Sequence, residues 1–395
     1  MPSTRHLARV RLMSPDVLIV GGGPAGSIAA LVLARAGVGV TILDRAVFPR
    51  DKLCGDSVNP GAMALLARHG LAAEVEGRAV PVSGMLVTGP GGAAVRAVYP
   101  GGVVGRSILR RELDARLVEA AIRAGARVEQ GVRVASAMVE SANGPRRVTG
   151  VLVQARGRTA ARPARIVIGA DGRHSSLAFA LGLARHPRRP RRWAIGAYFE
   201  GVTDLSDVGE MHVRRGHYIG VAVVPDGLVN ACLVVPEARA RAIGLASAEA
   251  LEQALGRDEQ LGARFRRARR ATPVTMLGPL AVDAGSAGVE GLLLAGDAAG
   301  FIDPMTGDGM RLAMRGGELA AAAALEALEG RVDAHVRLAQ RRREELGGKL
   351  RVNRLLRTLV AAPTGVSLAA AAARVWPEIL APVINYAGDL HLSSS

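Results

Sequence analysis

The sequence predicts an α/β fold: a doubly wound, three-layer domain with a parallel sheet, interrupted by an inserted antiparallel sheet. Three short apolar runs predict the parallel sheet, at residues 16–20, 165–170 and 291–295, and each ends in a glycine-containing turn. Strands that are buried on both faces are continuously apolar, and ligands of such sheets bind beyond the carboxyl ends of the strands. We therefore expect the three turns to lie together around a ligand.

The first run opens a complete β-α-β unit. Residues 16–20 lead into a turn with Gly21, Gly23 and Gly26, an Ala/Leu-rich helical segment follows, and a second apolar strand ends at Asp44. In this pattern the first glycine permits the tight turn, the second lets the backbone approach a pyrophosphate, and the third lets helix and strand pack closely. Asp44 is placed to hold a ribose. The unit predicts a dinucleotide site.

Composition limits the alternatives. The chain has 395 residues, of which 49% are hydrophobic, enough for a large core and two or three domains. Its two cysteines, Cys54 and Cys232, suggest no disulfide framework. We find no apolar signal segment and no apolar run of about 18 residues. We expect a cytoplasmic protein, and peripheral association with the inner membrane surface is the alternative.

The formal net charge is +16, and almost all of the positive charge is arginine. The arginines cluster at residues 185–192, 264–270 and 341–343. Only 3% of residues are aromatic, so the stacking platforms of single-stranded nucleic-acid binders are not evident. We expect these clusters to lie on the solvated surface, and attraction to an anionic membrane stays open as a second interpretation.

A family resemblance rests on the loop after Asp44. The glycine pattern, Asp44 and the run Phe48-Pro-Arg-Asp-Lys-Leu-Cys-Gly-Asp56 together resemble the geranylgeranyl reductase family, FAD-dependent oxidoreductases related to para-hydroxybenzoate hydroxylase. The resemblance extends from Asp16 to about Ala320 through four separated motifs. It implies FAD as the bound cofactor and NAD(P)H as a transient reductant.

The resemblance also implies a set of cofactor-binding residues. They comprise the glycine turn, the loop after Asp44, an arginine beside a helix, and the two later strand-end turns. These residues are Gly21, Gly23, Pro24, Ala25, Gly26, Asp44, Arg45, Lys52, Cys54, Gly55, Arg106, Asp171, Gly172, Gly296, Asp297, Pro304, Gly307, Gly309 and Met310. In the family, the aspartate that matches Asp297 binds the ribityl chain, and the turn with Gly307 and Gly309 abuts the isoalloxazine ring.

The predicted substrate sheet is strand-rich from residue 193 to 235 and turns at Pro225-Asp226-Gly227. Relatives carry bulky aromatics just before this proline, and halogenases resemble Trp-x-Trp-x-Ile-Pro there, whereas this chain has Gly220 and Ala222. Halogenation is therefore disfavoured, and a wider apolar pocket is expected. Its predicted residues are Tyr198, Tyr218, Gly220, Ala222 and Pro225.

The predicted domains interleave along the chain. The FAD-binding domain is expected at residues 14–78, 105–185 and 272–330, the substrate domain at 79–104 and 186–271, and a helical C-terminal segment at 331–395. A hairpin turn is expected at Ser141-Ala-Asn-Gly144. In the C-terminal segment, four residues resemble a cap on the substrate side: Trp376, Pro377, Pro382 and Tyr386.

The function expected from these features is reduction of a carbon–carbon double bond in an isoprenoid, polyketide or quinone-like substrate held mainly by shape. Monooxygenation through a flavin hydroperoxide is the alternative. A tRNA-modifying flavoprotein and a membrane redox partner are further alternatives. Cys54, Asp56 and Asp308 are weak candidates for acid–base chemistry. No His/Cys set has metal-ligand spacing, no nucleic-acid partner is expected, and the sequence leaves the oligomeric state undetermined.

Overall fold

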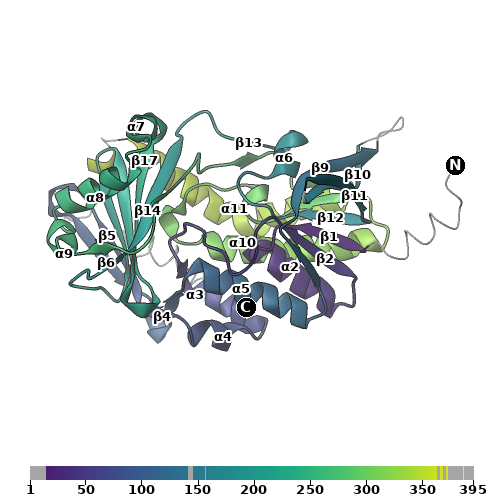
Figure 1. The fold of residues 1–395 in the computed structure, drawn as a ribbon, viewed down its shortest axis with the longest axis horizontal. Helices are drawn as coiled ribbons and strands as arrows, with labels where there is room; N and C mark the ends of the chain where they lie inside the picture. Colours follow the sequence, from purple (N-terminus) through teal and green to yellow (C-terminus); the bar gives the residue numbers. More distant parts are fainter. Residues whose placement is uncertain are drawn as a thin grey trace, which may run out of the picture.

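The computed structural model describes residues 15–140, 146–155, 157–362, 365–367, 371 and 386. The molecule is elongated, with a parallel sheet and its helices at one end and a large antiparallel sheet at the other (Figure 1). The predicted turn at 141–144 and the predicted cap residues Trp376, Pro377 and Pro382 lie outside the described residues.

The parallel sheet has six strands in the order β21-β22-β12-β1-β2-β8. All neighbours run parallel except the edge strand β21. The strands are β1 (Val17–Val20), β2 (Val40–Asp44), β8 (Arg127–Gln130), β12 (Ile166–Gly169), β21 (Gly288–Val289) and β22 (Leu292–Leu294). The three apolar runs are adjacent central strands, so their carboxyl ends share one edge, as the sequence predicts.

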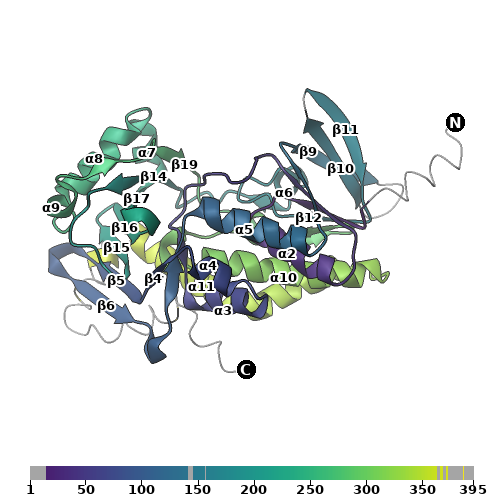
Figure 2. The ribbon, with the colours of Figure 1, turned by 60° about the horizontal axis from the view of Figure 1, so that its bottom comes forward.

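Helices cover one face of this sheet and a small sheet covers the other (Figure 2). The helices are α2 (Pro24–Arg35), α3 (Pro60–Arg68), α4 (Ala72–Glu76), α5 (Arg110–Arg123), α10 (Gly309–Leu328) and α11 (Ala334–Ala361). The covering sheet contains β9 (Arg133–Glu140), β10 (Arg147–Ala155) and β11 (Arg158–Pro163), next to α6 (Ser176–Ala180). The predicted three-layer α/β fold is confirmed.

The eight-stranded sheet has the order β18-β14-β17-β16-β15-β5-β6, with β19 also paired to β14. Its strands are β5 (Gly84–Thr88), β6 (Ala94–Val98), β14 (Arg192–Glu200), β15 (Gly209–Arg214), β16 (His217–Val223), β17 (Val229–Pro236), β18 (Arg269–Arg270) and β19 (Thr275–Leu277). One expectation is wrong in detail: β5 pairs with β15 in parallel, so the sheet is mixed. Residues between 84 and 98 therefore extend this sheet from far away in sequence.

Short helices pack on the outer face of the eight-stranded sheet. They are α7 (Glu237–Ile243), α8 (Ser247–Arg257) and α9 (Gly262–Phe265), and the remaining short helices are the 3-10 turns η1 (Pro90–Gly92), η2 (Pro100–Gly102), η3 (Pro225–Gly227), η4 (Gly296–Ala299) and η5 (Pro304–Thr306). Leu251, Leu255 and Phe265 from these helices join the outer core. Strand β18 follows these three helices along the chain.

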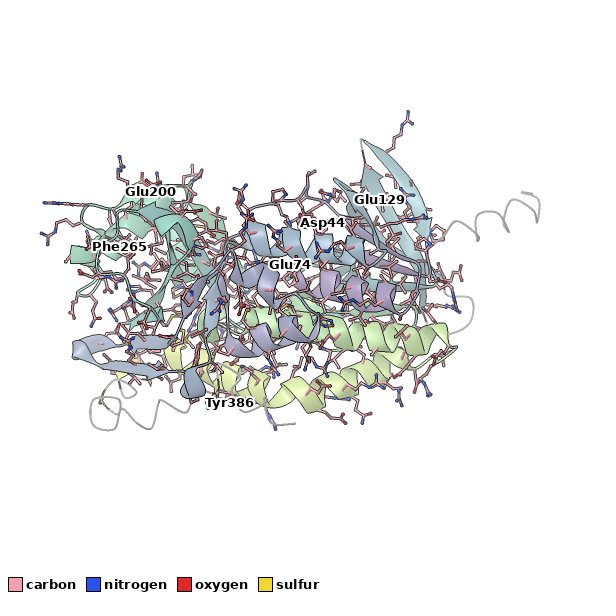
Figure 3. The ribbon with its side chains drawn as sticks, turned by 90° about the horizontal axis from the view of Figure 1, so that it is seen from below. Asp44, Glu74, Glu129, Glu200, Phe265 and Tyr386 are labelled. Carbon is pink, nitrogen blue, oxygen red and sulfur yellow. The ribbon has the colours of Figure 1, made fainter. Side chains whose placement is uncertain are left out.

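Small strand pairs connect the two halves. They are β3 (Ser57–Val58), β4 (Val80–Val82) and β7 (Gly105–Ser107), which form one sheet, and β13 (Ala184–Arg185) with β20 (Asp283–Ala284). In Figure 3, Asp44 lies in the half with the parallel sheet, whereas Glu200 and Phe265 lie in the other half. The chain segments that link the halves bring the glycine-containing turns and the loop after Asp44 beside the inner face of the eight-stranded sheet.

Candidate functional site

The glycine turn after β1 has the geometry that its sequence predicts. Gly21 has φ +100°, and a Cβ there would lie 2.5 Å from the carbonyl oxygen of Ala170. A Cβ on Gly26 would lie 1.9 Å from the carbonyl oxygen of Gly21, so only glycine permits this packing of α2. At Gly23 the nearest atom to such a Cβ is Nη2 of Arg50, 3.7 Å away. The turn is therefore closely packed at Gly21 and Gly26, whereas Gly23 leaves space beside it.

Asp44 at the end of β2 is buried beside this turn. Its Oδ2 accepts a hydrogen bond from the Gly22 amide at 2.7 Å, and its Oδ1 accepts one from the Ala46 amide at 2.8 Å. These contacts fix the carboxylate at the strand end, where the ribose is expected. Arg45 beside it is exposed.

The loop after Asp44 folds back over the glycine turn. Arg50 forms an ion pair with Asp114 at 3.1 Å, and its guanidinium stacks over Phe48 with 5.0 Å to the ring centroid. Arg110 also binds Asp114, with hydrogen bonds of 2.8 and 2.9 Å from Nη2. Burial and the nearby Arg110 lower the pKa of Lys52, whereas Asp297 and Asp114 raise it. The loop thus brings Arg50 and Lys52 toward the start of α5, where Arg50 and Arg110 share the fully buried Asp114.

The second strand-end turn contributes unsatisfied polar groups. Asp171 Oδ2 accepts hydrogen bonds from the amide and the hydroxyl of Ser176, at 2.8 and 3.2 Å. Its Oδ1 and the Nε of Arg173 are buried and have no hydrogen-bond partner among the described residues. Burial raises the pKa of Asp171 and lowers that of Arg173, which Asp297 partly restores. Gly172 has φ +84° and open space beyond it.

The third turn, from Gly296 to Met310, is anchored by two aspartates. Asp303 accepts hydrogen bonds from Tyr218 at 2.5 Å and from Arg192 at 3.1 Å. Asp308 accepts from Thr306 at 2.7 Å and from Asn353 at 2.9 Å, and Lys349 lies 3.6 Å away. Asp308 is only 2% exposed, and these contacts anchor the turn to α11.

The intervening residues Asp297, Pro304, Gly307 and Gly309 keep accessible surface. Gly307 has φ +66° and nothing within 4 Å of an added Cβ. Met310 is buried in the helix-side core, so its side chain packs rather than faces a ligand. The turn therefore offers backbone and Asp297 to a ligand, while its buried aspartates hold it in place.

The inner face of the antiparallel sheet meets this region. Gly220 pairs with Cys232 on β17 and with Met211 on β15, and a Cβ on Gly220 would meet nothing within 4 Å. Ala222 is half-buried on the same face. Burial raises the pKa of the Cys232 thiol to about 12, so it stays protonated and apolar. The face carries small side chains at Gly220 and Ala222, and a substrate pocket there stays a prediction.

One polar cluster interrupts this face. Asp56 Oδ2 accepts hydrogen bonds from Tyr198 Oη at 2.7 Å and from Asn230 Nδ2 at 2.5 Å, and Oδ1 accepts from the Arg110 amide at 3.1 Å. Asn230 also donates to the Cys54 carbonyl oxygen at 2.5 Å. Asp56 is fully buried, and burial raises the pKa of its carboxyl to about 6. The cluster joins the loop after Asp44 to the eight-stranded sheet.

Two predicted residues lie differently from expectation. Tyr218 is 2% exposed and is committed to Asp303, so it supports the loop and exposes almost no pocket surface. Arg106 donates to Glu76 of α4 at 3.0 Å instead of pointing among the clustered turns. Pro225 opens the predicted hairpin turn, in which Asp226 and Gly227 both have positive φ. Cys54 and Gly55 do lie in the loop beside the cluster, with Cys54 half-buried.

Sequence analysis did not single out four residues of the candidate site: Arg110, Asp114, Arg173 and Asn230. Arg110 and Asp114 are four residues apart on the first turns of α5, a spacing that forms helix ion pairs on many surfaces. Asn230 is one polar residue in an apolar strand. That last pattern was the available signal, because a polar residue within a buried strand needs a partner. Among the described residues, no cluster of three or more His, Cys, Asp or Glu could hold a metal ion.

Comparisons with known proteins decide the family. The profile of an FAD binding domain matches residues 14–343. The menaquinone reductase of Mycobacterium tuberculosis is 32% identical over 326 residues, covering 78% of this chain and 76% of the relative. The digeranylgeranylglycerophospholipid reductase 2 of Methanopyrus kandleri is 30% identical over 331 residues, covering 80% of this chain and 78% of the relative. The chain belongs to the geranylgeranyl reductase family of FAD-dependent oxidoreductases.

Conditioned medium factor receptor 1 of Dictyostelium discoideum is also similar, at 29% identity over 351 residues, and the chain spans 65% of that relative's length. Among solved structures, the flavin-dependent brominase Bmp2 superposes with a TM-score of 0.82 at 19% identity, covering 96% of this chain and 94% of that one. A geranylgeranyl bacteriochlorophyll reductase-like protein from Thermoplasma acidophilum gives 0.74 at 22% identity, covering 96% and 93%. At these identities the two structures show the shared fold.

The residues present fit the FAD that this family binds. The open space above Gly23 and beyond Gly172 would admit a cofactor backbone, and the unpartnered Nε of Arg173 offers a donor beside Asp297. Diphosphate oxygens need such donors at a helix N-terminus, and ribose hydroxyls need acceptors such as Asp44. Individual roles of Arg45, Lys52, Arg106 and Asp297 toward FAD stay predictions.

Proposed function

We propose that the protein is a reductase that saturates a carbon–carbon double bond in a hydrophobic isoprenoid or quinone-like substrate, with NAD(P)H as the reductant. The observation that supports this most is the Tyr198–Asp56–Asn230 cluster, which places the polar chemistry at one point of an otherwise apolar face. The relatives named menaquinone reductase and digeranylgeranylglycerophospholipid reductase support the substrate class.

In this proposal the bound flavin supplies a hydride, and the chain supplies the proton. Tyr198 is half-buried, and its Oη lies 2.7 Å from Asp56 Oδ2. Burial and the nearby Asp56 raise the pKa of Tyr198, so a proton that Tyr198 gives to the substrate must be replaced at once from a protonated Asp56. Burial raises the pKa of Asp56 to about 6, so at pH 6 and below this carboxyl mostly carries the proton that refills Tyr198. Met211, Cys232 and Leu53 belong to one apolar cluster of this region.

Membrane contact is part of the proposal, because an isoprenoid substrate partitions into lipid. Among the described residues, no helix is long and apolar enough to cross a membrane. The net charge of +16 would favour transient contact with an anionic membrane surface.

Monooxygenation is the second candidate. It is favoured by the departure from the family's aromatic residues at Gly220 and Ala222, where an added Cβ on Gly220 meets open space. The two reactions leave different products. A reduced substrate gains two hydrogen atoms without oxygen, whereas a hydroxylated or epoxidised substrate gains one oxygen atom.

The test uses the full chain reconstituted with FAD, NADPH and menaquinone or a geranylgeranyl lipid, first without oxygen and then in air, with products identified by mass. We expect a gain of hydrogen under both conditions, and oxygen insertion only in air would overturn the reductase proposal. Tyr198→Phe should lower product formation about 100-fold while flavin reduction by NADPH is unchanged. Unchanged product formation in this variant would remove Tyr198 from the proton path.

A further inference from the structure

Arg342 differs from its neighbours in the arginine run 341–343. Arg343 is exposed, and Arg341 pairs with Glu326 of α10. Arg342 instead carries its guanidinium into the interior, where Nη2 donates to the Ala299 carbonyl oxygen at 3.1 Å. Its Nη1 is buried without a hydrogen-bond partner among the described residues. A cation buried in this way is costly unless an anion compensates it.

The surroundings are built to admit this cation. A Cβ on Gly316 would lie 3.0 Å from Nη1 of Arg342, and a Cβ on Gly317 would lie 2.3 Å from the Ala25 carbonyl oxygen. Two consecutive glycines in the interior of α10 weaken a helix, so their presence reflects these two close approaches. Burial alone lowers the pKa of Arg342 to about 10, and no described carboxylate offsets this shift.

The position of Arg342 indicates which anion could compensate its charge. The same added Cβ on Gly316 lies 3.4 Å from the Gly296 amide, and a Cβ on Gly296 would lie 2.9 Å from the Ala25 side chain. Gly296 therefore lies between Arg342 and the first turn of α2. The N-terminus of α2 is where this fold receives the cofactor diphosphate.

We propose that the counter-charge of Arg342 is the diphosphate of bound FAD, acting across the η4 turn that Arg342 holds through Ala299. Arg342 is thus a positioning residue that would act on the cofactor through the η4 turn. The apoprotein carries an uncompensated buried charge, which FAD relieves. This inference rests on the FAD binding that the family shows and is independent of the substrate.

The test compares Arg342→Met, Arg342→Lys and the matched surface control Arg343→Gln. Arg342→Met should leave the FAD-free protein at least as stable to heat as the natural chain, because a buried charge is removed. It should nevertheless weaken FAD about tenfold, measured by flavin fluorescence, and Arg342→Lys should recover part of that loss. The control should change neither quantity.

A second readout separates charge from structure. ADP carries the diphosphate and riboflavin carries no phosphate, so Arg342→Met should weaken ADP and leave riboflavin binding unchanged. Equal loss for both, or a loss of FAD affinity that merely follows lower apoprotein stability, would overturn the proposal. So would chloride or sulfate that stabilises the natural apoprotein but not Arg342→Met, with FAD affinity unaltered, because a small anion would then be the partner.

Discussion

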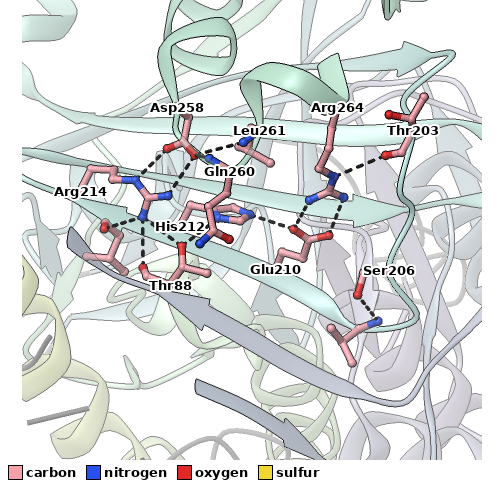
Figure 4. Close-up of polar contacts among 12 residues, drawn as sticks. Thr88, Thr203, Ser206, Glu210, His212, Arg214, Asp258, Gln260, Leu261 and Arg264 are labelled. Atoms are coloured by element: carbon pink, nitrogen blue, oxygen red, sulfur yellow. Dashed lines mark hydrogen bonds and ion pairs between the residues drawn. The ribbon is translucent and has the colours of Figure 1, made fainter. Parts of the chain in front are cut away.

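The two faces of the eight-stranded sheet differ in how they treat polar groups, although the same strands build both. On the outer face, β15 carries Glu210 and His212, and Figure 4 shows them bonded to Arg264 and its neighbours. Arg264 donates to both carboxylate oxygens of Glu210, at 2.7 and 2.8 Å, and His212 bridges Glu210 and Thr88 at 2.9 Å on each side. Met211, between them in sequence, points to the inner face.

The inner face has few polar groups. In its cluster, hydrogen bonds offset the burial of the Asp56 carboxylate less fully than they do for Glu210. Despite the burial that opposes it, hydrogen bonds from His212 and Arg264 hold the pKa of Glu210 below its usual value. For Asp56 burial prevails, and its pKa is raised to about 6. The outer network therefore stabilises a charged form and serves as scaffold, whereas the inner cluster keeps a proton within reach, which suits chemistry.

The largest effect should follow from breaking the outer network. Arg264→Met leaves the buried Glu210 carboxylate without its bidentate partner, and we expect a loss of about 4 kcal/mol in unfolding free energy. Denaturant unfolding measures it, with the exposed Arg266→Met as control. The double variant Glu210→Gln/Arg264→Met should regain part of the loss. If Arg264→Met unfolds like the natural chain, the outer network does not stabilise the fold as we expect.

A pH-dependent effect should mark the inner cluster. The folded-state pKa of Asp56, about 6, lies above its usual 3.8, so Asp56 favours folding below the usual value and loses that contribution as pH rises through about 6. The contribution amounts to about 3 kcal/mol. Asp56→Asn lacks this titration, so its stability relative to the natural chain should increase by that amount between the two values. A stability difference that is independent of pH would contradict the raised pKa.

The smallest effect on stability should come from filling the inner face. Gly220→Trp places a large side chain where an added Cβ meets nothing within 4 Å, so we expect less than about 1 kcal/mol of destabilisation. We expect kcat/KM for an isoprenoid substrate to fall about tenfold, because the added bulk takes substrate volume. Arg215→Trp, at the exposed end of the same hairpin, is the control. Equal kinetics of the two variants would place the substrate elsewhere.

Much of the cofactor site was accessible from the sequence because its determinants are local. Gly21, Gly26 and Asp44 act through steric limits and strand ends, which a short pattern specifies. The three apolar runs predicted that their turns lie together at one edge of a parallel sheet, and Gly220 and Ala222 predicted a face with small side chains. These predictions needed no knowledge of distant contacts.

The arginine clusters show what only the tertiary structure decides. The expectation that they are solvated surface is wrong for one member of each: Arg192 binds the buried Asp303, Arg264 binds the buried Glu210, and Arg342 enters the interior beneath η4. Their sequence neighbours give no sign of this. A charged side chain becomes structural only through partners at a distance of tens to hundreds of residues, so its role depends on how the chain packs, not on the run that contains it.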